Sequence, residues 1–199
     1  MSGIDRKAQI LKEATRLFSR HGYDKVTIKE LARACGITEP ALYRHFESKE
    51  AIYDTVLTTI ESRLADQEFF SRLTAEDNLE VLLDKLARHI IDYFTLNEDC
   101  YRLLMFSALA GHARSKEVFD LLRGTYTRFL AGQLDRLFQS GSIVEMNNEL
   151  TARCFTGMVF DCAMYASLWK TLQGQQVEPC QMIANNVPIY VRGLRKEPA

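Results

Sequence analysis

The sequence predicts an all-α protein. Apolar residues recur at intervals of three and four along most of the chain, and the short breaks between these patterns contain glycine or asparagine. Only four prolines and ten glycines occur among the 199 residues. No useful stretch alternates between apolar and polar residues, as a half-buried strand would, and no repeat or low-complexity linker divides the chain.

An opening helix is expected over residues 4–21, and Gly22 ends it. Its apolar stripe consists of Ile4, Ala8, Leu11, Ala14 and Phe18. This stripe should support the two helices that follow.

A second helix begins after Thr27. Thr27 stands at an N-cap position and Glu30 three residues later, which is the spacing of a capping box. The helix runs to Cys35, because Gly36 can adopt the left-handed conformation that ends a helix. A tight turn is therefore expected at Gly36.

A third helix begins after Thr38, a second N-cap residue. Pro40 is tolerated in its first turn, where a backbone N–H is not needed, and Leu42 packs back against Ile37. Two crossed helices joined at Gly36 have the spacing of a helix-turn-helix.

Longer helices are expected in the rest of the chain. Ser48 caps one that continues to residue 64, and Thr74 or Asp77 starts the next. Further helical patterns cover residues 98–110, 115–139, 148–172 and 179–194, with breaks at Asn97, Gly111, Gly141 and Gly174. Pro188 should bend the last helix.

The N-terminal part is the cationic end of the chain. Residues 1–52 hold ten Lys and Arg against seven Asp and Glu, a net of +3, and the remainder holds 15 against 19, a net of −4. Ordinary solvated surface also explains so small a difference. No segment has the pattern of a signal peptide or a membrane span, so a cytoplasmic location is expected. The five cysteines are dispersed, which predicts reduced thiols packed as small hydrophobic groups.

The segment after the third helix resembles one protein family. LYRHF at residues 42–46, followed by SKE at 48–50, is similar to the end of the DNA-binding domain in TetR-family transcriptional regulators. The resemblance is specific from about residue 7 to 53 and architectural beyond. It implies a three-helix DNA-binding domain at residues 1–50 and a larger helical effector-binding and dimerisation domain at residues 51–199. Pro40 stands where many relatives have glycine.

Helix-turn-helix proteins insert the start of the second helix of the motif into the major groove. Arg44 can donate two hydrogen bonds to guanine or bind phosphate, and Glu39 can accept from cytosine. The resemblance implies phosphate contacts for Thr27, Tyr43, His45 and Lys49, although Thr27 is also a cap and Tyr43 could be a core aromatic residue. The predicted DNA-binding residues are Thr27, Thr38, Glu39, Pro40, Ala41, Tyr43, Arg44, His45 and Lys49.

The resemblance also implies a small-molecule effector bound between the long helices. The candidates are mostly large apolar side chains, each of which could instead belong to the core: Phe94, Tyr101, Met105, Phe119, Tyr126, Met158, Asp161, Tyr165 and Trp169. Their composition favours an apolar or aromatic effector. Asp161 lies in an apolar run, so it pairs with a cation, faces solvent at a dimer rim or meets a ligand. His89 and His112 are further polar candidates.

A homodimer reading palindromic double-stranded DNA is expected, because one helix-turn-helix offers too few base contacts for a specific site. The resemblance places the pairing surface on the last two helices. Their apolar residues serve either that surface or the core of one chain: Phe155, Val159, Cys162, Leu168, Ile183, Val187, Tyr190, Val191 and Leu194.

Enzyme activity is not expected. The chain has no phosphate-binding glycine loop, no HExxH and no GxSxG, and its four histidines lack metal-ligand spacing, so no catalytic residue, cofactor or metal is predicted. The sequence therefore predicts a DNA-binding regulator, most often a repressor in this family, that a small effector releases. The alternative is a helical DNA-binding regulator controlled by a partner protein or by no ligand.

Overall fold

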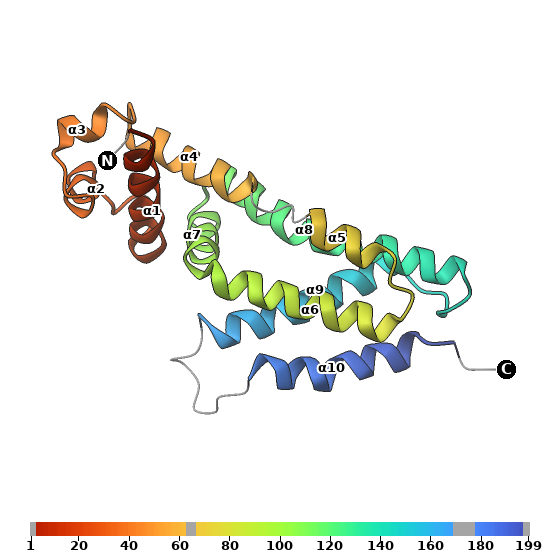
Figure 1. Ribbon diagram of the computed structural model, residues 1–199. Helices are drawn as coiled ribbons and strands as arrows, with labels where there is room; N and C mark the ends of the chain where they lie inside the picture. The colour runs from red at the N-terminus through yellow and green to blue at the C-terminus, as the bar shows by residue number, and fades with distance from the viewer. Residues whose placement is uncertain (1–2, 63–66, 169–177, 197–199) are drawn as a thin grey trace. The chain divides into compact units, whose positions relative to one another are not determined.

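The computed structural model describes residues 3–62, 67–168 and 178–196, and within these it contains ten helices and no strand (Figure 1). The all-α prediction is confirmed. The helices are α1 (Gly3–His21), α2 (Ile28–Ala34), α3 (Glu39–Tyr43), α4 (Lys49–Ser62), α5 (Gln67–Thr74), α6 (Leu79–Leu96), α7 (Glu98–Leu109), α8 (Ala113–Gln139), α9 (Asn148–Ala166) and α10 (Pro179–Leu194).

The chain divides into two compact units. The first unit contains residues 1–64 and 99–122, and the second contains residues 65–98 and 123–199. Helix α7 and the first part of α8 therefore pack with the N-terminal helices. The functional boundary expected near residue 50 stays a prediction.

The core of the first unit begins on α1, which packs against α2 and α4. Ile10, Ala14 and Phe18 lie one turn apart and are fully buried. The expected stripe was partly wrong, because Ala8 is exposed and Leu11 is only half-buried. Among the residues of α1 whose burial is described, the buried line therefore runs from Ile10 to Phe18, and the side chain of Ile4 lies outside that set.

Two tertiary hydrogen bonds extend this core to α7 and α8. The Tyr53 hydroxyl on α4 lies 2.5 Å from Ser115 Oγ on α8, and both residues are buried. Ser19 Oγ on α1 donates to Asp99 Oδ1 on α7 at 2.8 Å. Both bonds satisfy polar groups that burial would otherwise make costly.

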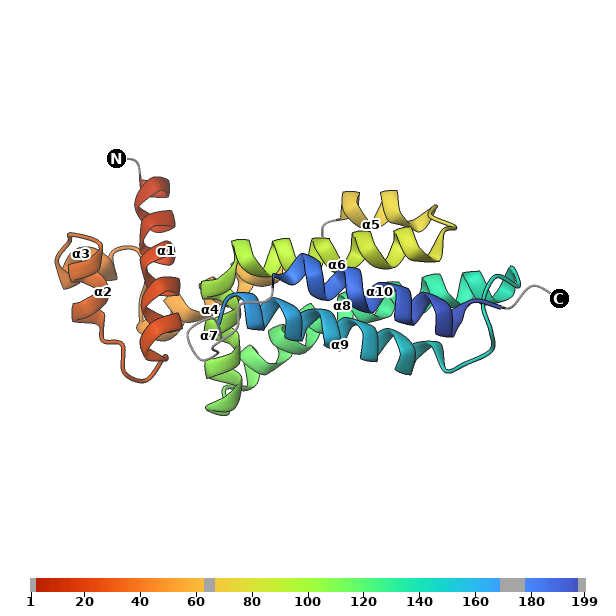
Figure 2. The same ribbon diagram turned by 90° about the horizontal axis from the view of Figure 1, so that it is seen from below.

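The second unit is built on three long helices. Helix α6 packs against α9 and α10, and α9 packs against α10 (Figure 2). Phe155, Val159, Val187 and Val191 are all at most 3% exposed in the single chain, so they form its core. Backbone pairing joins the end of α10 to the α8–α9 loop, since Val144 N–H donates to the Leu194 carbonyl at 2.9 Å. Ile143 and Arg195 form an antiparallel bridge beside it.

The start of α6 corrects the predicted boundary. Neither Thr74 nor Asp77 caps this helix; Asn78 does, because its Oδ1 accepts from the N–H groups of Glu80 at 3.0 Å and Val81 at 3.3 Å. The Asp77 carboxylate is instead paired with Arg136 on α8. Helix α5, which ends at Thr74, was not expected as a separate element.

Most other boundaries agree closely with the sequence prediction. Ser48 caps α4 as expected, with Ser48 Oγ accepting from Ala51 N–H at 3.0 Å. Helix α9 ends at Ala166, short of the predicted residue 172. Gly174 and Trp169 lie outside the described residues. None of the described helices combines the length and the hydropathy needed to cross a bilayer.

The cysteines differ in their exposure to solvent. Cys35 and Cys162 are buried as predicted, and burial raises the pKa of each thiol, so both remain protonated at neutral pH. Cys154 and Cys180 are exposed, so the prediction of packed thiols was wrong for these two.

Candidate nucleic-acid interface

Helix α2 begins with the predicted capping box. Thr27 Oγ1 accepts from Glu30 N–H at 3.2 Å, and the Glu30 carboxylate accepts from Thr27 N–H at 2.8 Å and from the Thr27 hydroxyl at 2.9 Å. These hydrogen bonds lower the pKa of Glu30, the backbone bond contributing most. The hydroxyl of Thr27 is therefore committed to the cap in this structure.

The turn between α2 and α3 is as tight as expected. Gly36 has a φ of 64°, which L side chains rarely adopt, and the Ile37 N–H donates back to the Ala32 carbonyl at 3.0 Å. Thr38 caps α3 by accepting from Ala41 N–H at 3.4 Å, and Pro40 lies in the first turn. The local chemistry of the sequence thus sets the geometry of both helices.

Helix α3 buries one face and exposes the other. Leu42 is fully buried and Phe46 nearly so, and they hold the segment on the unit's core. Tyr43 is 50% exposed, which excludes the alternative that it is a core aromatic residue. The other predicted contacts of this segment are exposed or half-buried: Thr38, Glu39, Pro40, Ala41, Arg44 and His45.

Lys49 is held by protein atoms. Its Nζ donates to the carbonyl oxygens of Tyr23 at 2.9 Å and Val26 at 3.0 Å, and it lies 4.2 Å from the centre of the Tyr23 ring. The ammonium thereby joins the α1–α2 loop to the start of α4. Its expected phosphate contact stays a prediction, and the structure adds a role in folding.

Two basic residues of α1 were missed as neighbours of this segment. Arg6 Nη1 donates to the carbonyl of Cys35 at 3.3 Å, at the end of α2, and Lys7 Nζ lies 5.0 Å from the centre of the Phe46 ring. Sequence reasoning treated the opening helix only as support. The adjacent cationic residues Arg6 and Lys7 near the start of α1 were the sequence feature that could have indicated contacts with the α2–α3 segment.

The predicted effector residues are divided between the units. Tyr101, Met105 and Phe119 belong to the first unit. Phe94, Tyr126, Met158, Asp161 and Tyr165 belong to the second. Phe94, Tyr101 and Tyr126 are at most 2% exposed. Asp161 is exposed, which agrees with the solvent-facing alternative for this carboxylate.

An aromatic cluster forms in the second unit around Tyr126. The rings of Phe69 and His89 stack at 3.6 Å, and Phe70 lies 4.8 Å from Phe129. The Tyr126 ring lies 5.6 Å from Phe70 and 6.0 Å from Phe160 on α9. Sequence reasoning missed Phe69 and Phe70, because α5 was not expected as an element. Within the described part of the chain, no group of three or more His, Cys, Asp or Glu side chains could hold a metal ion.

Comparisons with known proteins agree with this geometry. The family described as "Bacterial regulatory proteins, tetR family" matches residues 10–56. The HTH-type transcriptional regulator YhgD of Bacillus subtilis (strain 168) is 24% identical over 165 residues, which span 79% of this chain and 84% of YhgD.

Solved structures show the same fold over almost the whole chain. NalD, a repressor of a multidrug efflux pump in Pseudomonas aeruginosa, has a TM-score of 0.70 at 18% identity and covers 99% of this chain and 100% of its own. AibR in complex with isovaleryl coenzyme A and operator DNA has a TM-score of 0.65 at 23% identity, covering 92% and 97%. Residues 10–56 thus match the DNA-binding domain of the TetR family, and the chain has the fold of TetR-family transcriptional regulators.

Proposed function

We propose that the chain is a repressor that binds a palindromic operator as a homodimer and is released by a small apolar or aromatic effector. The observation that carries the DNA-binding part is the exposed face of α3. The cap residue and the buried residue of α3 stabilise the helix and its packing. The exposed side chains of the helix can form hydrogen bonds with base edges and phosphates.

The proposed contacts divide into two kinds. Arg44 reads guanine through two hydrogen bonds, and Glu39 accepts from a cytosine amino group. Thr38 and Ala41 lie on the exposed first turn, where they meet thymine methyl groups or phosphates, and Pro40 shapes that turn. Tyr43, His45, Lys49 and the N-terminal end of α2 at Thr27 contact phosphates and set the register.

Selection of bound sequences from a random DNA pool tests this proposal. A palindrome should be enriched, because two α3 helices related by a two-fold axis read equivalent half-sites. Enrichment of no sequence, or of one unpaired half-site, would contradict the proposed operator.

Arg44 and Tyr43 should respond differently to removal. Arg44→Ala is expected to relax the preference at one base pair, worth about 1–3 kcal/mol of discrimination for a bidentate contact. Tyr43→Ala should weaken binding to every sequence alike and leave the slope of log affinity against log salt nearly unchanged, because a neutral hydroxyl bound to a phosphate releases no counterion. Fluorescence anisotropy with the selected operator and with single-base-pair variants of it distinguishes the two effects. An unchanged base preference in Arg44→Ala would make Arg44 a contact to the DNA backbone.

We further propose that the effector binds among the aromatic groups of the second unit. Phe94, Tyr126, Met158 and Tyr165 lie in the same unit as the aromatic cluster, and few charges accompany them. AibR, which shares the fold, forms a complex with a coenzyme A thioester and operator DNA. That complex supports a small-molecule ligand for a protein of this fold, and the aromatic cluster here favours an apolar or aromatic moiety.

Melting temperatures against a panel of small molecules test the effector. Aromatic acids, aliphatic acyl compounds and sugar phosphates should be compared at equal concentration, and only the first two classes are expected to raise the melting temperature. A rise in melting temperature with the sugar phosphates alone would contradict the proposal of an apolar or aromatic effector. No stabilisation by any compound would favour a regulator controlled by a partner protein or by no ligand.

A further inference from the structure

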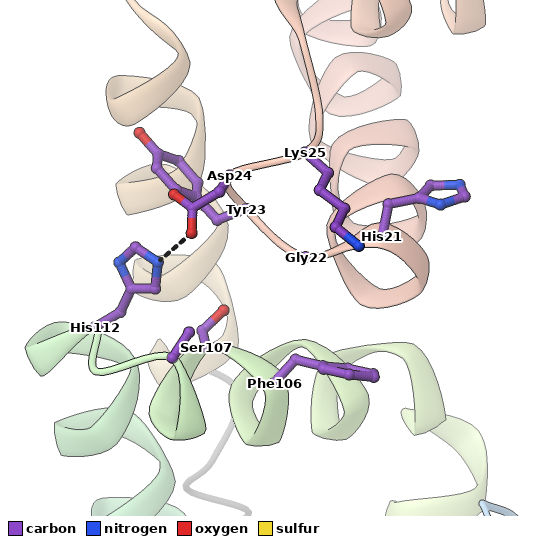
Figure 3. A pocket seen from close by; sticks show the side chains of 9 residues that line it. His21, Gly22, Tyr23, Asp24, Lys25, Phe106, Ser107 and His112 are labelled. Atoms are coloured by element: carbon purple, nitrogen blue, oxygen red, sulfur yellow. Dashed lines mark ion pairs between the residues drawn. The ribbon is translucent and has the colours of Figure 1, made fainter.

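A small cavity lies in the first unit, away from the exposed face of α3. It has a volume of about 130 Å³ and is bounded by the α1–α2 loop at residues 21–25 on one side (Figure 3). Phe106, Ser107 and Ala110 of the α7 segment and His112 in the next turn bound the other side. His112 is one of the polar candidates for the predicted effector site, and the proposed DNA contacts use none of the residues that line the cavity.

Ser107 is the buried polar residue among those that line the cavity. The residue is 2% exposed, yet its Oγ has no hydrogen-bond partner among the residues that the structure describes. Other helical hydroxyl groups, such as Thr55 and Thr59 on α4, donate to the carbonyl four residues earlier. A buried hydroxyl without a partner is costly, and Figure 3 shows this one directed toward the α1–α2 loop. Ser107 can therefore donate a hydrogen bond to a bound molecule or accept one from it.

The charges around the cavity are balanced. Lys25 and Asp24 contribute opposite charges from the loop, and Asp24 Oδ2 lies 3.9 Å from His112 Nε2. The C-terminal end of α1 at His21 has a partial negative charge, and the N-terminal end of α8 after His112 has a partial positive one. The site thus favours neither an anion nor a cation, and an uncharged molecule loses the least solvation on entering it.

The size and the lining of the cavity limit the molecule further. Tyr23, Phe106 and His112 supply aromatic rings to the walls. The cavity opens to solvent, since Phe106 is 52% exposed and Ala110 is exposed, and its volume of about 130 Å³ is of the order that a single six-membered ring occupies.

We propose that this cavity binds a compact, uncharged ring compound with one hydroxyl or carbonyl group, which forms a hydrogen bond with Ser107. The residues involved differ from those of the aromatic cluster. The bound molecule contacts the same loop whose Tyr23 carbonyl is bound by Lys49. This site is therefore a second ligand site in the chain, additional to the proposed effector site.

The test uses phenol as the probe, with benzene and benzoate for comparison. Phenol titrated into the full chain should produce saturable amide chemical-shift changes at residues 21–25 and 106–112. Its affinity should exceed that of benzene by about fivefold to tenfold, the usual effect of one hydrogen bond, and benzoate should bind more weakly than phenol.

Three variants locate the site. Ser107→Ala should lose about fivefold to tenfold in phenol affinity and leave benzene affinity unchanged. It should fold normally, because it removes an unpartnered hydroxyl. Ala110→Leu should abolish binding of both by filling the cavity. Ser62→Ala is the control, since its hydroxyl is exposed and donates to the Thr59 carbonyl.

The proposal is overturned by any of the following results. These are shifts confined to other residues, equal phenol affinity in the wild type and Ser107→Ala, or a preference for benzoate. Absence of saturable shifts would mean that the cavity holds only solvent, which also overturns it. The assay contains no DNA, so its outcome is independent of the proposed operator binding.

Discussion

The ammonium of Lys49 has its geometry fixed in the free protein. Two of its three N–H groups are directed at the Tyr23 and Val26 carbonyls, and the third is the one with which it would meet a phosphate. Tyr23 itself packs against Phe18 and Tyr53, and burial raises the pKa of its phenol, so the ring stays neutral beside the cation. A charge held in this way costs little further ordering when DNA binds.

Lys49→Met should lower the free energy of unfolding by about 1–3 kcal/mol, because it removes a charged donor from two carbonyls while keeping most of the side-chain volume. Urea denaturation of the full chain measures the effect. The control is Lys29→Met, on the exposed surface of α2, which should change stability by less than about 0.5 kcal/mol. Equal stability of the two variants would show that the carbonyl contacts of Lys49 contribute nothing to folding.

The capping box should give stability that depends on pH. The folded pKa of Glu30 is depressed, so its contribution is complete above the pKa of an unfolded Glu and is lost as the pH falls through the folded value. The difference in melting temperature between the wild type and Glu30→Gln should therefore shrink on acidification below the usual range of a Glu side chain. Glu47→Gln, on an exposed residue outside the box, is the control. A difference in melting temperature that stays constant with pH would contradict a stabilising role for the ionised Glu30 carboxylate.

Among the helices and turns, the sequence predicts best those boundaries that are set by contacts between residues close together in the chain. The start of α2, the turn at Gly36 and the start of α3 follow from caps that contact residues within a few positions, so the sequence alone located them. The N-cap of helix α6 is Asn78 instead of the predicted Thr74 or Asp77, and Asp77 pairs with Arg136, far away in the sequence. Helix α5 was not predicted because its apolar pattern is short and lies in the segment between the longer patterns of two neighbouring helices.

In the candidate nucleic-acid interface as well, the sequence predicts features that depend on nearby residues and misses those that depend on distant contacts. The exposed positions of α3 followed from its helical period, and Leu42 and Phe46 are buried as expected. The partners of Lys49 could not be predicted, since the carbonyls of Tyr23 and Val26 meet it only through the fold. Ser107 shows the same limit, because its burial depends on the α1–α2 loop reaching α7.

The turn between α2 and α3 can be tested with a pair of glycines. Gly36→Ala has space for the new Cβ but must keep a φ of 64°, which should cost about 1–2 kcal/mol. Gly132→Ala, at an exposed position inside α8 with equal space, should instead stabilise the chain by about 0.5–1 kcal/mol. Thermal or urea unfolding of both variants is the measurement. Destabilisation of both by the same amount would exclude the backbone conformation as the cause.

For the whole molecule, the structure shows which apolar residues of α9 and α10 are buried within one chain and which stay exposed. Most of the apolar residues considered for dimer pairing are core residues of one chain, including Phe155, Val159 and Val187. The large apolar side chains of these helices that remain exposed are Leu150 and Ile189, each 58% accessible. We infer that a dimer formed through these helices uses this second set.

Ile189→Asp should therefore shift the protein from dimer to monomer, because it places a charge in the buried part of the proposed interface. Sedimentation velocity at micromolar concentration measures the shift. Leu109→Asp is the matched control, as Leu109 is 84% exposed on α7 and lies outside the last two helices. A wild-type monomer, or a dimer that tolerates Ile189→Asp, would contradict this interface.

The backbone pairing of Val144 with Leu194 affects how the end of helix α10 opens. Helix ends ordinarily fray first, and their amides exchange with solvent fastest. Here the last turn of α10 cannot unwind unless the hydrogen bond to the α8–α9 loop and the bridge between Ile143 and Arg195 also break. Deuterium uptake at the Val144 amide and at the amides of the last turn of α10 should therefore report the same opening event, and both should be slower than at an unpaired helix end.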